Sequence, residues 1–259
     1  MGRLGSLNVN IRVCRLDLEI TSCNIEKKSL VPLVKGFTQP SGKRCCLRLE
    51  IVNQGRPRSR DETQNLSTDD LNSMVTAQLI SKDQLRVIVR SLHPGALSLA
   101  VGHLIFAALS ERSGLLLHAA CLIRDHRAYI FLGKSGAGKS TITQHASHMT
   151  YVNDDKIAVR RVRGKWLAFG APLTDNTGLP SLDIVAPIAG LYFLEKHFQE
   201  SCLPLDVKQA IARMPAQLIL PKVDHLSLTT LYQTMLSLAA ETKSYLLNFR
   251  VDSDVSRFI

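Results

Sequence analysis

Hydrophobic and polar positions alternate in short runs along the first third of the chain. This period of two is typical of half-buried β-strands, and it is found at residues 10–13, 47–51 and 84–90. Between the last two runs, residues 53–73 are polar, charged and nearly free of large hydrophobic side chains, which indicates a loop or linker. We therefore expect a small N-terminal β-rich module at residues 1–90, followed by a second domain at residues 91–259.

The second domain begins with a helical pattern and continues as strands joined by tight turns. Hydrophobic residues recur at helical spacing between residues 95 and 109. The polar turn 124–127 then separates a hydrophobic strand at 115–123 from the strand at 129–132. Four turn residues between two strands allow only a hairpin, so these strands should be antiparallel. The further elements that we expect are a helix at 140–148, a strand at 151–155, a hairpin of 157–162 with 166–169, a strand-like run at 191–195, and, within 200–259, a helix, a longer helix at about 223–240 and an alternating strand at 245–251.

A glycine-rich loop after the strand at 129–132 satisfies the pattern G-x-x-x-x-G-K-[ST] in full. The expected nucleotide-binding residues are Gly133, Lys134, Ser135, Gly136, Ala137, Gly138, Lys139, Ser140 and Thr141. Glycines let backbone N–H groups converge on phosphate oxygens, which is why a strand, such a loop and a helix together predict ATP binding. We expect Lys139 to reach the β and γ phosphates and the Ser140 hydroxyl to hold Mg²⁺.

Two adjacent carboxylates, Asp154 and Asp155, end the strand that follows this loop and its helix. In phosphoryl transfer one carboxylate can orient Mg²⁺ while the other takes the proton of an attacking hydroxyl. Local sequence favours this role and a solvated turn equally. His118 lies in the hydrophobic strand 115–123, where a histidine is more often a core residue. This strand should run antiparallel to the strand at 129–132, which leads into the glycine-rich loop, and it could therefore place His118 beside the aspartate pair.

Composition and charge limit the class of protein and of partner. A hydrophobic content of 45% and a charged content of 21% are those of a globular protein of 259 residues. The net charge is +10, with basic runs at 43–60 and 160–165, which favours an acidic or phosphate-bearing acceptor, with the second run as the better candidate. Aromatic residues make up 5% and no nucleic-acid-binding motif accompanies the charge, so we do not expect nucleic acid.

The sequence also carries indications of location. The longest hydrophobic stretch is shorter than the roughly 18 residues that a membrane span needs, and no secretory segment opens the chain. The six cysteines include no C-x-x-C pair. We therefore expect a cytoplasmic protein with reduced thiols and no membrane partner.

His118, the loop at 133–140 and the pair Asp154-Asp155, in this order, resemble the HPr kinase/phosphorylase family, whose P-loop core is akin to phosphoenolpyruvate carboxykinase. The resemblance covers about residues 115–172. It implies that Asp155 is the base that deprotonates the acceptor hydroxyl, with His118 and Lys139 as catalytic accessories and Ser140 as a metal ligand. Thr141 departs from the family, which usually has an acidic residue there. In length and in its loop the chain looks more like stand-alone HPr-kinase-like proteins, some of which phosphorylate a serine of a lasso-peptide precursor.

These observations together predict an α/β fold with an HPr-kinase-like P-loop core, a mixed sheet and the small N-terminal β-rich module. The expected activity is ATP-dependent transfer of the γ-phosphate to a hydroxyl, with a peptide or protein serine as the favoured acceptor. Two alternatives stay open: a nucleotide-binding regulator or ATPase without an acceptor, and a kinase of a small-molecule hydroxyl. A homo-oligomer is compatible with the sequence.

Overall fold

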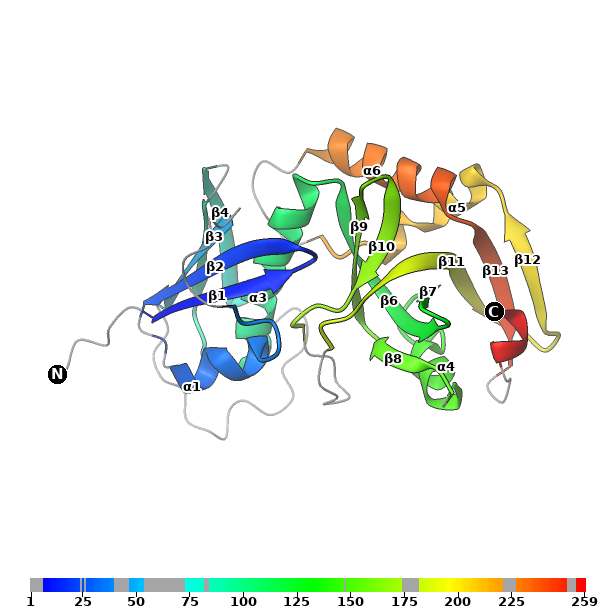
Figure 1. Cartoon of the computed structure of the whole chain (residues 1–259), viewed down its shortest axis with the longest axis horizontal. Coiled ribbons are helices and arrows are strands. Elements are labelled where there is room, and N and C mark those ends of the chain that lie inside the picture. Colours follow the sequence, from blue (N-terminus) through cyan, green and yellow to red (C-terminus); the bar gives the residue numbers. More distant parts are fainter. Residues whose placement is uncertain are drawn as a thin grey trace. The chain divides into compact units, whose positions relative to one another are not determined.

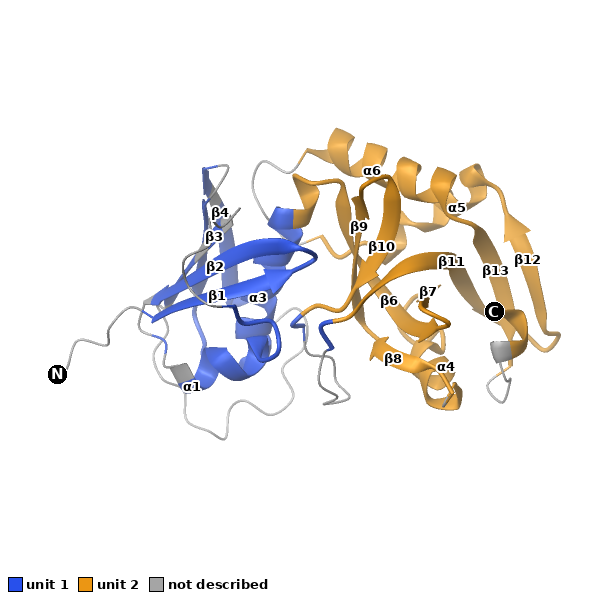
Figure 2. Ribbon diagram, in the orientation of Figure 1, with its two compact units in different colours: residues 1–108, 172–183, 221–226 blue, residues 109–171, 184–220, 227–259 orange. Residues whose placement is uncertain are grey.

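The chain forms a mixed α/β structure with two mixed sheets, one in each of two compact units (Figure 2). The computed structural model describes residues 7–23, 25, 27–39, 47–53, 73–81, 84–146, 148–173, 182–220, 227–250 and 255–259. The first unit comprises residues 1–108, 172–183 and 221–226, and the second comprises 109–171, 184–220 and 227–259. The loop expected at 53–73 lies, apart from its two end residues, outside the described residues. The domain boundary expected between residues 90 and 91 stays a prediction.

The first unit is built on a five-stranded sheet with the order β1-β2-β3-β5-β4 (Figure 1). Its elements are β1 (Leu7–Val13), β2 (Leu16–Cys23), α1 (Lys27–Leu30), the 3₁₀ helix η1 (Val31–Val34), β3 (Leu47–Asn53), β4 (Val75–Ser81), β5 (Gln84–Val89) and most of α3 (Pro94–Ser110). Strand β3 runs parallel to both of its neighbours, whereas the two outer pairs are antiparallel. Buried positions alternate along β1 and β5, as the period of two predicts.

The second unit contains a larger sheet with the order β10-β9-β6-β7-β11-β13-β12, and β8 pairs with β6 beside this path. Its strands are β6 (Gly114–Arg124), β7 (Arg127–Leu132), β8 (Thr150–Asn153), β9 (Lys156–Val162), β10 (Lys165–Phe169), β11 (Val185–Lys196), β12 (Ser201–Leu205) and β13 (Ser244–Phe249). The first part of β11 also pairs with β10, so the strands from β10 to β11 close on themselves. Strand β7 is antiparallel to β6 and parallel to β11, which makes this sheet mixed as well.

Helices cover both faces of this sheet. They are α4 (Lys139–His145), α5 (Val207–Arg213), α6 (Leu228–Glu241) and the 3₁₀ helices η3 (Pro215–Gln217) and η4 (Val255–Phe258). Ile142 and Ala146, on α4 and just after it, pack in a buried cluster with Phe131 of β7 and Phe249 of β13. Helices α5 and α6 lie on the other side of the sheet (Figure 1). The loop at 133–138 therefore leads from the central strand β7 into the helix that covers one face.

The expected elements of this unit are largely confirmed, with one unpredicted strand and one helix that is shorter than expected. The hairpin of β6 and β7 is antiparallel as predicted, and β9 pairs with β10 as predicted. The first helix expected within 200–259 is α5, and before it lies the strand β12, which was not predicted and which pairs with the distant strand β13. Helix α4 ends at His145 rather than at residue 148.

Candidate functional site

The glycine-rich loop has a backbone that only glycine fits at two positions. Gly136 and Gly138 have φ angles of 78° and 101°, in the left-handed region that side chains disfavour. A Cβ atom on Gly138 would also lie 2.5 Å from Cζ of Phe249, and one on Gly133 would lie 2.6 Å from Cβ of Ala137. The glycines of the motif are therefore required by the shape of the loop itself.

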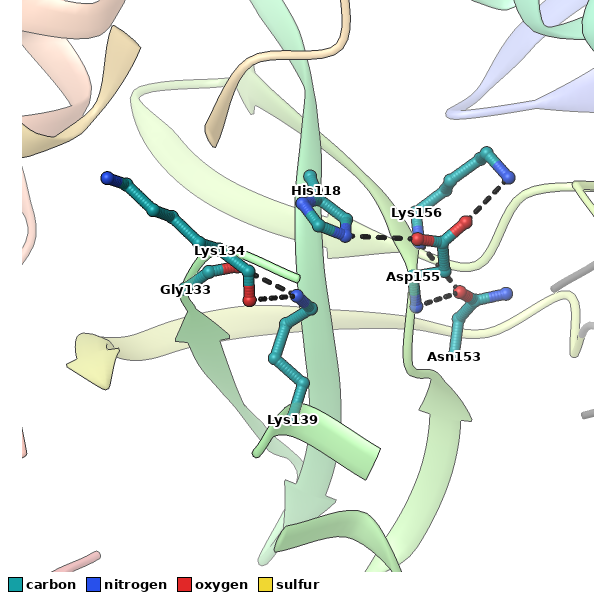
Figure 3. Close-up of polar contacts among 7 residues, drawn as sticks. All are labelled: His118, Gly133, Lys134, Lys139, Asn153, Asp155 and Lys156. Carbon is teal, nitrogen blue, oxygen red and sulfur yellow. Dashed lines mark hydrogen bonds and ion pairs between the residues drawn. The ribbon is translucent and has the colours of Figure 1, made fainter. Parts of the chain in front are cut away.

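Lys139, the first residue of α4, folds back over this loop. Its ammonium donates to the carbonyl oxygens of Gly133 at 2.7 Å and Lys134 at 3.2 Å (Figure 3). Burial lowers the pKa of Lys139, while the negative charges of Asp155 and Asp154 act in the opposite direction. The aspartate pair thus acts on the charge of the loop lysine, as it would if the two lay on the same side of the sheet.

This proximity follows from how two strands share one edge of β6. Strand β8 pairs with the later part of β6, at Cys121 to Ile123, and β9 pairs with the earlier part, at Gly114 to His118. Asp154 and Asp155 form the break between β8 and β9, where the carbonyl of Asp155 accepts from the Ala119 amide at 3.1 Å.

On the other side of β6, Ala119 is the register partner of Leu132, the last residue before the loop. The start of the phosphate loop, the centre of β6 and the aspartate pair therefore lie at one level of the sheet.

The Asp155 carboxylate is held on both of its oxygens. Nε2 of His118 lies 3.2 Å from Oδ1, and Nζ of Lys156 lies 2.6 Å from Oδ2 (Figure 3). Burial alone would raise the pKa of Asp155, but the hydrogen bond from His118 and the charge of Lys156 outweigh it and hold that pKa well below its usual range. The lowered pKa keeps the Asp155 carboxylate ionised. Its side chain is 36% exposed, so an incoming group can still reach it.

Asn153 shapes the turn that presents this carboxylate. Its side-chain oxygen accepts hydrogen bonds from the backbone amides of Asp155 and Lys156, both at 2.8 Å. Asn153 and Asp154 are buried, with exposed fractions of 3% and 6%. An asparagine that caps its own following turn is a common local motif, so the triplet Asn-Asp-Asp carried a signal for this role that our sequence reasoning did not use.

The structure brings together four of the predicted site residues: Lys139, His118, Asp154 and Asp155. Sequence reasoning missed Lys156, which is opposite His118 in the register of β6 and β9. No local pattern marks this lysine, because its role depends on the break between two strands.

The basic run at 160–165, the candidate for attracting an acidic acceptor, does not begin beside Asp155, and its part in acceptor binding stays a prediction. Strand β9 begins at Lys156 and runs away from the aspartate pair, so Arg160 is four residues, or about 13 Å, further along. Arg161 pairs with Glu241 of α6 at 2.9 Å, and Nε of Arg160 donates to the Arg112 carbonyl at 3.3 Å. The other basic run, at 43–60, is described only at residues 47–53.

The residues of the site fit a phosphate donor and a metal that arrives with it. The loop backbone and Lys139 form a cradle in which Gly133 and Gly138 leave no room for a side chain. Ser140 and Asp154 could supply oxygen ligands, the kind that Mg²⁺ prefers, and Mg²⁺ commonly binds through one or two protein ligands together with substrate phosphates. Among the described residues, no three His, Cys, Asp or Glu side chains are gathered closely enough to hold a metal ion by themselves.

No protein-family model and no curated protein matches this sequence. Among solved structures, the chain is similar to the Hpr(Ser) kinase/phosphatase from Coxiella burnetii, with 13% identity, 52% of this chain and 85% of that chain covered, and a TM-score of 0.31. Such a TM-score does not establish a shared fold. In the part of the chain that the structure describes, no helix combines the length and hydrophobicity needed to cross a bilayer.

Proposed function

We propose that this chain is an ATP-dependent kinase of the HPr-kinase-like type, which transfers the γ-phosphate to a hydroxyl, with a peptide or protein serine as acceptor. The observation that carries the proposal is the strand register that places Asp155, with its carboxylate held by His118, at the level of the sheet where the glycine-rich loop begins. A phosphate cradle alone is common to switches, motors and kinases. A carboxylate beside the cradle supplies a proton acceptor for an attacking hydroxyl.

On the donor side, the loop amides and Lys139 bind the phosphates of ATP. Lys139 already has its ammonium at the loop carbonyls, so a bound γ-phosphate would exchange these contacts for ion pairs with phosphate oxygens. Mg²⁺, held by Ser140 and Asp154 together with the phosphates, would neutralise the charge that develops as the phosphoryl group moves.

On the acceptor side, Asp155 orients the hydroxyl and takes its proton. The acceptor oxygen forms a bond to the γ-phosphorus, the bond from that phosphorus to the β,γ-bridging oxygen breaks, and the proton passes to the Asp155 carboxylate. The products are the phosphorylated hydroxyl and ADP, whose new charge Lys139 compensates. Because the transition state of such transfers is loose, a carboxylate with a lowered pKa is adequate as the base.

His118 contacts Oδ1 of the Asp155 carboxylate, and Oδ2 faces Lys156. The contact with His118 therefore fixes the orientation of the carboxylate. A side chain that orients the base contributes by keeping the reacting atoms aligned, which is the main source of rate in phosphoryl transfer. This arrangement would be superfluous in a protein that only changes conformation when a nucleotide binds.

The test is the fate of the γ-phosphate. The purified protein is incubated with γ-labelled ATP, Mg²⁺ and a cell extract freed of nucleotides, with Lys139→Ala as the control for contaminating kinases. Label in a discrete peptide or protein, absent with the control variant, is the expected result. Label released only as free phosphate would support the ATPase alternative instead, and label in a small molecule would support the small-molecule kinase.

A further inference from the structure

The carboxyl ends of three neighbouring strands lie at one edge of the larger sheet. Strand β7 is parallel to β11, and β11 is parallel to β13. Leu132, the last residue of β7, is opposite Phe193, so β11 continues for three more residues, to Lys196, beyond the level at which the glycine-rich loop begins. In open α/β sheets, ligands bind outside the carboxyl ends of the strands. The segment after β11 therefore lies at the same edge as the candidate phosphate site.

This segment is tied to the glycine-rich loop through Phe249, the last residue of β13. The ring of Phe249 packs so closely against Gly138 that a Cβ atom on this glycine would lie 2.5 Å from Cζ. The backbone carbonyl of the same phenylalanine accepts a hydrogen bond from the amide of His197 at 3.0 Å. His197, the first residue after β11, is thus separated from the loop by one residue that contacts both.

His197 and Phe198 form a stacked aromatic pair on the surface. The centres of their rings are 4.3 Å apart, with an angle of 27° between the ring planes. Nδ1 of the imidazole lies 3.1 Å from the backbone amide nitrogen of Gln199, which fixes the ring that supports the phenylalanine. Phe198 is 82% exposed, the highest fraction among the large hydrophobic side chains that the structure describes. A flat hydrophobic ring is therefore held at the surface with most of its area open to a ligand.

The candidate base, Asp155, lies on the opposite side of the loop strand. Strand β7 has β6 as one neighbour, whose far edge carries the aspartate pair, and β11 as the other. In the proposed function the γ-phosphate faces Asp155, so the α-phosphate and the nucleoside extend away from that carboxylate. In this direction the nucleoside meets the carboxyl ends of β11 and β13, where the aromatic pair is.

We propose that Phe198 stacks on the nucleobase of the bound nucleotide, which makes the segment 197–200 a base-binding subsite for a purine. This inference rests on the proposed binding of MgATP at the glycine-rich loop. Stacking on an aromatic ring uses the flat face of a base and not its hydrogen-bonding groups. The subsite therefore favours purines, which have the larger ring system, and distinguishes adenine from guanine weakly.

The experiment measures by calorimetry the affinity of the protein for four ligands in the presence of Mg²⁺. Three are the nucleotides ATP, GTP and CTP, and the fourth is tripolyphosphate, which has three phosphates and no base. We expect wild-type protein to bind ATP and GTP with similar affinity and to bind CTP and tripolyphosphate more weakly. The difference between ATP and tripolyphosphate reports the contribution of the nucleoside.

The same four affinities are then measured in variants. Phe198→Ala should weaken the binding of ATP and GTP at least about fivefold, as expected for the loss of one stacked aromatic ring, and should leave tripolyphosphate as in wild type. Phe198→Trp keeps a flat ring and should retain the affinity for ATP. Tyr232→Ala removes another exposed aromatic ring, on α6 at the other side of the sheet (Figure 1), and should change none of the four affinities.

The possible failures are distinct. Wild-type protein that binds neither ATP nor tripolyphosphate would contradict the proposed function, and this inference with it. Three other results would overturn the base-binding subsite alone: wild-type protein that binds ATP no more tightly than tripolyphosphate, Phe198→Ala that binds ATP as tightly as wild type, or Phe198→Ala that loses ATP and tripolyphosphate affinity equally.

Discussion

Nε2 of His118 lies 3.2 Å from Oδ1 of Asp155, although the two residues belong to different segments of the chain. The contact exists because β8 and β9 divide one edge of β6 between them, and Asp155 lies at the break, next to the residue where β9 begins to pair with His118. On the opposite edge of β6, the register places the start of the glycine-rich loop at the same level. Strand pairing therefore brings a candidate base to a candidate phosphate site.

Lys139→Ala and Ser140→Ala should each abolish MgATP-dependent activity in a protein that stays folded. Lys139 compensates the charge of the phosphates, and the hydroxyl of Ser140 is a ligand for Mg²⁺. Turnover is measured with labelled ATP, and folding by circular dichroism. Thr143→Ala, which changes a hydroxyl one turn further along α4, is the matched control and should retain activity. Unchanged turnover in both site variants would mean that another part of the chain binds the nucleotide.

Gly138→Ala should destabilise the protein more than Gly164→Ala and should weaken MgATP binding. Both glycines have a left-handed φ, which costs other residues about 1–2 kcal/mol. A Cβ on Gly138 would additionally meet the Phe249 ring at 2.5 Å, whereas Gly164 has open space around it. Urea unfolding gives the two changes in stability, and calorimetry gives the affinity. Equal destabilisation by the two substitutions would contradict the close packing of the loop against Phe249.

Asn153→Ala should lower the rate of phosphoryl transfer while the affinity for ATP changes little. The substitution removes the acceptor of two part-buried backbone N–H groups, and a typical hydrogen bond contributes about 0.5–1.5 kcal/mol to stability. The turn that presents Asp155 then loosens. Asn248→Ala is the control, because Asn248 donates to Ser201 between β12 and β13. If both variants slow the transfer equally, Asn153 has only a general structural role.

The stability of the first unit should fall as the pH drops below about 6.5. His103 on α3 is 4% exposed, and burial lowers its pKa despite a hydrogen bond with the Leu99 carbonyl. The unfolded chain therefore takes up a proton at a pH at which the folded chain does not, so stability is fully present above the ordinary histidine pKa of about 6.5 and is lost below it.

One such group contributes at most about 1.4 kcal/mol per pH unit. Urea midpoints between pH 5 and pH 8 measure the effect. His103→Gln should flatten the dependence relative to wild type, and His145→Gln, on an exposed position of α4, should not. A dependence that is identical in wild type and His103→Gln would show that other groups cause it.

The elements that local sequence determines were the ones that could be predicted. The hairpin of β6 and β7 follows from two hydrophobic strands around a polar turn, and its turn residues Asp125 and His126 both adopt the positive φ that tight hairpins need. Strand β12 could not be predicted, because its burial does not alternate and it forms only by pairing with β13, some forty residues later.

The same distinction applies to the site. The motif at 133–140 and the pair of aspartates are visible as local patterns. His118 could be suggested because its strand, β6, is the antiparallel neighbour of β7, the strand before the motif. The contribution of Lys156 depends on where β9 begins along β6, which no local pattern specifies. The direction of the 160–165 run depends on the same strand, and its part in acceptor binding stays a prediction.

The most direct test of the central claim separates binding from chemistry at Asp155. Asp155→Asn keeps the size of the side chain and removes its ability to accept a full proton. We predict that MgATP affinity, measured by calorimetry, stays within a few-fold of wild type, while transfer of the labelled γ-phosphate to the acceptor falls by about 10²–10⁴, the usual contribution of a general base. A variant that transfers phosphate at the wild-type rate would contradict the account, and so would one that loses MgATP binding, because Asp155 would then be a metal ligand rather than the base.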